Sequence, residues 1–380
     1  MKKIFYWSPC LANVGTIRST INSAIALSKY NNLKYEILLI NSCGEWDKYR
    51  DICKQNNVKL LDLTFNYFNF LPKRGYILSR ISYLIVFFIS YLPLLKILNK
   101  NKESFIICHL ITSLPLLLML LHKPKINFIL RISGYPNLNL IREQFWKFCS
   151  KSLYKVTSPT IDLIDQIKQK NIFNNKLLYF LPDAVINMKN ILKQKKNNIE
   201  KKSIKENRFI SVGRLTKQKN FLYLIDEFEK FAKVNSKYNL FIYGEGEQLS
   251  ILKKTIHKKK LKKRVFLMGF SNNIFFEMRR SSCFLLTSLW EEPGIVLMEA
   301  AINNLFIISS DCKNGPREFL NNGKAGVLFK KNQKDALFNE LLKYEKIDYH
   351  EKKKKIFNAK LNSRKYSTFY HYLRFKEILK

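Results

Sequence analysis

Short apolar segments with the character of buried strands alternate with longer amphipathic segments along this 380-residue chain. In the first half, the pattern predicts a helix over 16–28 and strands over 3–7, 35–40, 104–108 and 127–132. Such alternation favours a parallel sheet wrapped by helices, because each crossover must return the chain to the same edge of the sheet. The first half therefore predicts an α/β domain.

The pattern then stops and restarts. Residues 187–207 are dominated by Lys and Asn and can bury little, so we interpret them as a surface linker. Beyond them, the sequence predicts five strands, over 208–212, 238–243, 265–268, 283–287 and 306–309. It also predicts two helices, over 221–234 and 246–257. We expect an α/β fold with two Rossmann-like domains, 1–180 and 181–355, facing across a cleft, and a helix in 356–380 that packs back toward the first domain.

The chain carries 67 Lys and Arg against 29 Asp and Glu, a net charge of +38. This excess attracts polyanions such as nucleic acid, an acidic lipid surface or a phosphate-bearing substrate. The abundance of Lys, Asn and Ile is also what an AT-rich genome favours, so charge alone selects none of these partners. The cationic residues are spread along the chain without a nucleic-acid-binding motif, which makes a nucleic-acid-binding protein the weaker alternative.

Membrane and compartment signals are modest. The apolar stretches 81–95 and 105–121 are each shorter than the roughly 18–20 residues that a span requires, and each contains a proline. We interpret both stretches first as buried helices and strands of an α/β domain. The alternative for the first stretch, which is flanked by cations, is partial insertion into an anionic leaflet. The basic N-terminus is interrupted by Ser8 and Pro9, so we expect a strand and no targeting segment. The seven cysteines form no C-x-x-C pair, which indicates a reducing cytoplasm.

Two segments carry the chemistry. Ser288-Leu-Trp-Glu-Glu-Pro-Gly-Ile-Val-Leu-Met-Glu299 follows an expected strand and enters a helix near Ile295, where free amides and the helix dipole favour an anion. Glu291 and Glu299 can accept hydrogen bonds from sugar hydroxyls, or could simply be a capping carboxylate and a solvated one. In Ser211-Val-Gly-Arg-Leu-Thr-Lys-Gln-Lys219, two cations at a strand-to-helix turn can converge on a diphosphate, although an ordinary basic loop would look the same.

The order of these motifs resembles the family 4 glycosyltransferases, of the group 1 type. The resemblance rests on G-R-x-x-x-x-K at Gly213–Lys219, Y-G-x-G at Gly244, M-G-F at Gly269 and E-x7-E at Glu291–Glu299, and it is strongest over 209–329. It implies the GT-B fold and metal-independent, retaining transfer of a sugar from a nucleotide-diphosphate donor, such as a UDP-sugar. Another enzyme with the GT-B fold, such as a sugar-nucleotide epimerase, is the alternative. No cofactor or metal is expected, and the acceptor would be a glycan or lipid-linked glycan of the cell surface, reached peripherally from the cytoplasmic face of the membrane.

The resemblance also implies roles for individual positions. The donor diphosphate would be held by Arg214, Lys219, Gly15 and the amides of Gly294, Ile295 and Val296. The transferred sugar would be contacted by Glu291 and His109, the ribose by Glu299, and the base by Gly269 and Phe270. From the residues alone, Arg131 at the end of an expected strand is a candidate for an acceptor or phosphate contact. Glu292-Pro293 replaces the family's frequent Gly-Phe, which could alter the sugar accepted.

Overall fold

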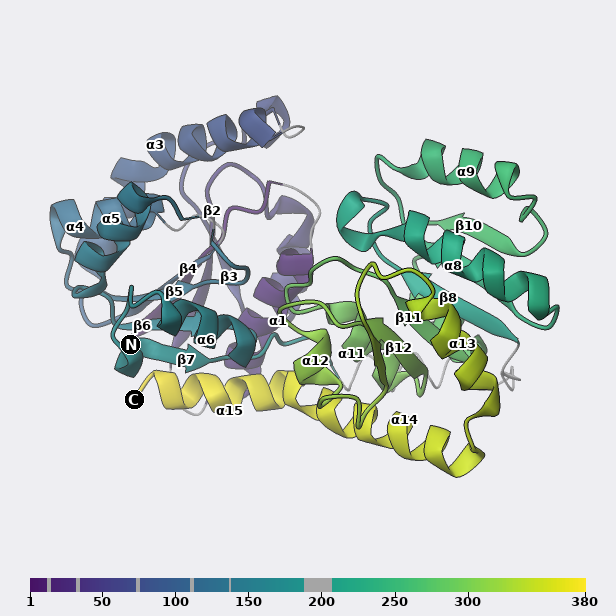
Figure 1. The fold of residues 1–380 in the computed structure, drawn as a ribbon. Coiled ribbons are helices and arrows are strands. Elements are labelled where there is room, and N and C mark those ends of the chain that lie inside the picture. Colours follow the sequence, from purple (N-terminus) through teal and green to yellow (C-terminus); the bar gives the residue numbers. More distant parts are fainter. Residues whose placement is uncertain (12–14, 32–34, 73–75, 110–112, 137, 188–206) are drawn as a thin grey trace. The chain divides into compact units, whose positions relative to one another are not determined.

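The computed structural model describes residues 1–11, 15–31, 35–72, 76–109, 113–136, 138–187 and 207–380. The chain divides into two compact units (Figure 1). Unit 1 comprises Met1–Asn187 and Ser367–Lys380, and unit 2 comprises Met188–Tyr366. Each unit is built around one parallel sheet of its own, as the alternating sequence pattern predicts.

The sheet of unit 1 has seven strands within the described residues, in the order β3-β2-β1-β4-β5-β6-β7. The chain order reverses at the centre, where β1 and β4 lie side by side in parallel. Both are buried along nearly their whole length, because helices cover both faces of the sheet. The strands are β1 (Lys3–Trp7), β2 (Glu36–Asn41), β3 (Lys59–Asp62), β4 (Phe105–His109), β5 (Asn127–Arg131), β6 (Lys155–Ser158) and β7 (Leu178–Phe180).

The helices of unit 1 form two layers. On one face, side chains such as Phe87 and Trp146 pack into a single apolar core, contributed by α3 (Tyr76–Lys100), α4 (Ser113–His122), α5 (Leu140–Ser150) and α6 (Ile161–Gln169). On the other face, Ile21 and Phe375 belong to a second core, contributed by α1 (Gly15–Lys29), α2 (Arg50–Gln55) and α15 (Thr368–Ile378). A chain segment from the far C-terminus thus completes the first unit, and α15 lies along α1 (Figure 1).

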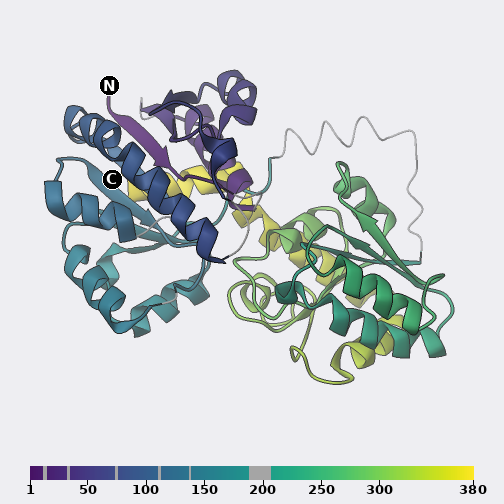
Figure 2. The ribbon, with the colours of Figure 1, turned by 90° about the horizontal axis from the view of Figure 1, so that it is seen from above.

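α3 is longer than the sequence analysis suggested. It is 25 residues long and continues through Pro93 without a break. Figure 2 shows it as one long blue helix of unit 1. Its part Arg80–Lys100 is long and apolar enough to cross a membrane by length and composition alone, and 33% of that part is buried inside the protein. The helix is longer than the uncharged stretch 81–95 because it includes residues 76–80 and 96–100 on either side, where apolar residues such as Leu98 accompany the charged ones.

The sheet of unit 2 has six parallel strands within the described residues, in the doubly wound order β10-β9-β8-β11-β12-β13. The strands are β8 (Arg208–Val212), β9 (Asn239–Tyr243), β10 (Val265–Gly269), β11 (Cys283–Leu286), β12 (Phe306–Ser310) and β13 (Val327–Phe329). One face carries α8 (Phe221–Val234), α9 (Leu249–Lys258) and α13 (Ala336–Lys346). The other helices of unit 2 are α10 (Ile274–Arg280), α11 (Ile295–Ile302), α12 (Pro316–Phe319) and α14 (Tyr349–Ser363). Of these, α11 packs against β12 and α14.

The boundaries differ from the expected ones in two places. Unit 1 continues past residue 180 to Asn187, because Leu181 and Ile186 are buried in it, and nearly all of the expected linker, 188–206, lies outside the described residues. The expected C-terminal helix is two helices: α14 packs against α11 in unit 2, whereas α15 packs against α1 in unit 1. Ser367 separates them by capping α15, since its side chain accepts a hydrogen bond from the Tyr370 amide.

Candidate functional site

Two loops meet at the centre of the unit 2 sheet, where the strand order reverses between β8 and β11. The chain leaves β8 at Val212 and runs through residues 213–220 before α8 begins, and it leaves β11 at Leu286 and runs through 287–294 before α11 begins. Because carboxyl ends of parallel strands share one edge, both loops lie where open α/β sheets bind their ligands.

Hydrogen bonds hold the two loops together. Thr287 Oγ1 donates to the Lys219 carbonyl at 2.9 Å, and the Leu289 amide donates to the Gln218 carbonyl at 2.8 Å. As a result, Lys219 Nζ lies 2.5 Å from Glu291 Oε1, and these side chains are only 13% and 4% exposed. The structure therefore brings together a cation and a carboxylate that are 72 residues apart in sequence.

Glu291 is held by more than Lys219. Ser288 Oγ donates to the same carboxylate oxygen, Oε1, at 2.5 Å. The Glu291 amide donates to the Lys313 carbonyl at 3.2 Å, and Ser310 Oγ donates to the Ser288 carbonyl at 2.7 Å. Main chain and side chain of Glu291 are thus both fixed, which favours a carboxylate that is positioned before a ligand arrives.

α11 begins directly after this loop. Its N-cap, Gly294, has φ +82°, a left-handed conformation that side chains other than glycine rarely adopt. A Cβ on Gly294 would also lie only 3.3 Å from Glu291 Cγ. The amides of Ile295 and Val296 have no intrahelical acceptor at this end of the helix, and the dipole favours negative charge there. The loop thus places a helix start beside the Lys219–Glu291 pair.

The remaining sequence-predicted residues of unit 2 surround this edge. Arg214 is exposed in the loop after β8, Glu299 is 7% exposed in α11, and Phe270 is 71% exposed just after β10. The Gly244 amide donates to the Gly269 carbonyl at 2.8 Å, and a Cβ on Gly244 would lie 1.9 Å from the Gly213 carbonyl oxygen. The glycines therefore let three successive strand-end loops pack directly against one another.

In unit 1, His109 ends β4 and is buried, with Nε2 2.5 Å from Ser133 Oγ. Burial, reinforced by the charge of Arg131, lowers the pKa of His109 to about 3, although the Asp183 carboxylate acts in the opposite direction. His109 is therefore a neutral imidazole at physiological pH. Gly15 is the first residue of α1, while Asn13, Val14 and Leu110 lie outside the described residues.

Arg131 ends β5 with a side chain that is 8% exposed. Its guanidinium bonds to the Asp183 carboxylate and donates to the Leu181 carbonyl at 3.3 Å, and Asp183 also accepts from Ser19 of α1. Burial alone would raise the pKa of Asp183, but the charge of Arg131 and these hydrogen bonds outweigh it and hold the pKa below its usual value. Arg131 thus has a structural partner, and its contact with an acceptor or phosphate stays a prediction.

Sequence reasoning missed two polar residues of these networks. For Ser288, the available signal in the sequence is its position three residues before Glu291, whose carboxylate it contacts. Asp183 follows β7, a three-residue strand too short to be recognised from the apolar pattern. Its pairing with Arg131 spans 52 residues, so nothing local in the sequence indicates it.

Comparison with known proteins identifies the second unit. A family model described as glycosyl transferases group 1 matches residues 193–362. The chain carries a group 1 glycosyl transferase domain. The resemblance predicted from the motifs of unit 2 is thereby confirmed, and these motifs lie within the matched residues, hereafter the transferase domain.

Relatives agree with this family. The chain is 41% identical over 112 residues to an uncharacterized glycosyltransferase of Methanocaldococcus jannaschii, covering 30% of this chain and 28% of that protein. It is 26% identical over 225 residues to an N-acetylgalactosamine-N,N'-diacetylbacillosaminyl-diphospho-undecaprenol 4-alpha-N-acetylgalactosaminyltransferase of Campylobacter jejuni, covering 57% and 60%. The matched part thus spans less than two thirds of either relative.

The fold is shared over the whole chain. A crystal structure of Anabaena HepE in complex with UDP superposes with a TM-score of 0.73 at 14% identity and covers 100% of this chain and 99% of that one. The predicted α/β class with two Rossmann-like domains, the GT-B architecture, is therefore confirmed.

Proposed function

We propose that this protein is a retaining glycosyltransferase that moves a sugar from a UDP-sugar to a glycan or lipid-linked glycan acceptor. The observation that carries the proposal is the Lys219–Glu291 pair, fixed at the start of α11 within a group 1 glycosyl transferase domain. Support for UDP comes from the UDP complex of the structurally similar HepE. Support for a lipid-linked acceptor comes from the diphospho-undecaprenol substrate named for the Campylobacter relative.

In the proposed reaction, the bond between the sugar C1 and the donor diphosphate breaks as an acceptor oxygen bonds to C1 on the same face. The acceptor proton passes to the leaving diphosphate oxygen, which serves as base. Lys219, the exposed Arg214 and the amides of Ile295 and Val296 stabilise the charge that develops on that oxygen. Glu291 accepts hydrogen bonds from the transferred sugar, and Glu299 accepts them from the ribose.

His109 is proposed to contact the transferred sugar from unit 1. Because burial keeps its imidazole neutral, it can offer a hydrogen bond to a hydroxyl without adding positive charge at the reacting carbon. Gly15 is proposed to border the donor phosphates, since a residue without a side chain allows their close approach at the start of α1.

Metal independence is part of the proposal. It is motivated by the sequence, which has no Asp-x-Asp motif at a strand end, and by fixed cations and helix amides that can take over charge stabilisation. We expect transfer to be unchanged by EDTA. Loss of activity with EDTA, and its return with Mg²⁺ or Mn²⁺, would contradict this part of the proposal alone.

The test of the proposed activity is a donor screen. UDP- and GDP-sugars are incubated with the full-length protein and an undecaprenyl-diphosphate-linked sugar, and released nucleotide diphosphate and the anomeric configuration of the product are measured. We expect release with at least one UDP-sugar and loss of roughly 100-fold or more in Glu291→Gln. An intact fold in Glu291→Gln, with release equal to the parent, would contradict the assigned role; binding of random DNA without any sugar transfer would favour the nucleic-acid alternative.

A peripheral membrane location is proposed from α3. Its exposed side is apolar from Ile81 to Leu92, about three turns of helix, and the exposed Arg80 and Lys96 flank this stretch. A face of this kind suits insertion among lipid headgroups, with cations attracted to an anionic leaflet. The apolar residues exposed on α3 are Leu78, Ile81, Leu84, Ile85, Phe88, Ile89 and Leu92.

Vesicle co-sedimentation tests this location. Phe88 and Leu92 are 68% and 65% exposed, so Phe88→Ser with Leu92→Ser should leave the fold intact while removing apolar area that would be buried in the membrane. At about 25 cal/mol per Å² of that area, we expect binding to fall by at least tenfold. Unchanged binding to anionic vesicles at low salt would contradict docking through α3.

A further inference from the structure

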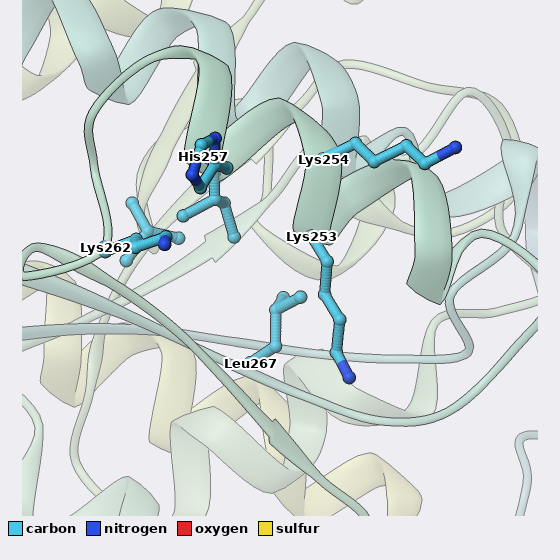
Figure 3. A pocket seen from close by; sticks show the side chains of 7 residues that line it. Lys253, Lys254, His257, Lys262 and Leu267 are labelled. Carbon is cyan, nitrogen blue, oxygen red and sulfur yellow. The ribbon is translucent and has the colours of Figure 1, made fainter.

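A groove in the transferase domain has no assigned role. It measures about 550 Å³ and lies between α9 and β10, the edge strand of the sheet. The floor is apolar, formed by Ile256, Val265 and Leu267. Four cationic or titratable side chains surround it, contributed by Lys253, Lys254, His257 and Lys262. Figure 3 shows Lys253 extending from α9 beside Leu267, whereas Lys254 extends away along the surface.

The segment of the chain that forms this groove carries cationic residues and no acidic ones. Residues 248–276 contain eight Lys and Arg and no Asp or Glu. Where these cations serve the fold, partners are present: Lys259 pairs with Asp226 and Glu229, and Arg264 donates to main-chain carbonyls. The three groove lysines are exposed and take part in no ion pair among the described residues. Their charge is therefore available to an external anion.

Apolar side chains distinguish the kinds of anion that fit. A soluble polyanion needs only cations, whereas a lipid surface also rewards burial of apolar groups between them. Besides the apolar floor, Ile251 on α9 is 48% exposed and Met268 on β10 is 46% exposed. The groove thus combines surrounding cations with an apolar floor, as in side chains that sit at a membrane interface.

We propose that the α9–β10 groove is a second membrane-contact site, which binds the phosphate headgroup of an anionic lipid. Lys253 and Lys262 neutralise the headgroup, Lys254 adds positive charge to the surface beside it, and Leu267 and its apolar neighbours contact the lipid chains beneath it. This inference rests on the proposed membrane location, but the residues that carry it and that its test changes belong neither to α3 nor to the donor site. Through this groove, the transferase domain would itself contact the membrane leaflet that carries a lipid-linked acceptor.

The experiment compares two triple variants of the full chain. Lys253→Gln, Lys254→Gln and Lys262→Gln empty the groove of lysines, while Lys334→Gln, Lys346→Gln and Lys354→Gln remove the same charge from exposed sites elsewhere in unit 2. Binding is measured to phosphatidylcholine vesicles with and without 30 mol% phosphatidylglycerol, at one fixed low salt concentration. Both variants should keep the parent melting temperature and the turnover of a soluble acceptor.

We expect the groove variant to lose at least tenfold in affinity for the anionic vesicles, since each lysine near an anionic leaflet strengthens binding by about fivefold. The control variant should lose less than threefold. Equal losses in the two variants would overturn the proposal, because net charge alone would then explain binding. Parent-like binding of the groove variant would overturn it as well, even if the Phe88/Leu92 variant loses binding through α3.

A second arm separates a lipid from a soluble polyanion. Leu267→Thr, which keeps a strand-forming residue, should weaken vesicle binding about threefold or more and leave the affinity for soluble inorganic polyphosphate unchanged. If polyphosphate binds the parent as tightly as the anionic vesicles do, and Leu267→Thr changes neither affinity, the groove is a site for soluble polyanions and the lipid assignment is wrong.

Discussion

At the scale of single residues, the pairing of Lys219 with Glu291 links the proposed binding of the donor diphosphate to the proposed binding of the transferred sugar. Each side chain is largely buried, so each would be costly to leave unpaired. In the absence of a donor they neutralise one another, and a bound donor would offer phosphate to Lys219 and hydroxyls to Glu291. Occupation of the site therefore depends on both halves of a sugar nucleotide.

Ser288 is expected to position Glu291. Its hydroxyl is fully buried and donates to Glu291 Oε1, and a hydrogen bond to a charged group contributes about 1.5–3 kcal/mol. We expect Ser288→Ala to lower kcat/KM by roughly tenfold or more, mainly through kcat, and Ser288→Thr to restore most of it. Steady-state kinetics with the parent's UDP-sugar checks this. If Ser288→Ala reduces stability without changing kcat, Ser288 only supports the loop.

Burial of His371 predicts how the stability of the protein depends on pH. Its Nδ1 lies 2.6 Å from the Pro182 carbonyl oxygen and its Nε2 2.7 Å from Ser23 Oγ. Burial lowers the pKa of His371 to about 4, although the hydrogen bond to Pro182 opposes this. Between about pH 6.5 and pH 4, His371 binds a proton in the unfolded chain but not in the folded one. The contribution of His371 to the free energy of unfolding is therefore fully present above pH 6.5 and is lost as pH falls to 4.

We therefore expect the free energy of unfolding to fall by up to about 1.4 kcal/mol per pH unit through this residue as pH drops from 6.5 to 4. His371→Gln, which keeps hydrogen-bonding groups but no titration, should make that decline shallower by the same amount. Urea unfolding at pH 7.5, 6.0 and 5.0 measures it. Parallel declines in parent and variant would show that His371 does not titrate in this window.

At the scale of elements, the start of α11 depends on one glycine. Gly294→Ala should cost roughly 1–2 kcal/mol of stability, because a left-handed conformation is strained for any residue with a Cβ. The added Cβ would also press on Glu291 Cγ, so we expect transfer to fall by at least tenfold. Gly323→Ala provides a matched control, since Gly323 also has a positive φ of +91° but belongs to a turn before β13.

The Gly323→Ala variant should show a comparable loss of stability by thermal unfolding while keeping its transfer rate per folded molecule. Equal activity losses in the two variants would mean that strain alone, and not the placement of Glu291 and the α11 amides, explains the effect at Gly294.

Element boundaries also show what the sequence could and could not predict. β1, β8 and α8 match the expected ranges because each is a continuous apolar or amphipathic run. β3, β6, β7 and β13 are absent from the expected strands because each is only three or four residues long, too short to show a pattern in the sequence. The residues of the candidate site were found through motifs, whereas their partners depend on tertiary contacts, as the Arg131–Asp183 pair shows.

At the scale of the whole molecule, the path of the chain has a consequence for stability. The last fourteen residues, Ser367–Lys380, belong to unit 1, and Tyr372, Phe375 and Ile378 lie in its core. Ending the chain at Tyr366 should therefore destabilise unit 1 by several kcal/mol and promote aggregation. Limited proteolysis of the shortened chain should degrade unit 1 first, and equal resistance of both units would contradict this assignment.

The proposed function requires that the loops after β8 and β11 bind a nucleotide diphosphate through Lys219. Isothermal titration of UDP into the full-length parent, Lys219→Ala and Lys217→Ala measures this directly, because Lys217 is an exposed cation of the same loop. We predict that the parent binds UDP, that Lys219→Ala weakens binding by at least tenfold and that Lys217→Ala changes it less than threefold. No binding by the parent at millimolar UDP, or equal weakening by both substitutions, would contradict the claim.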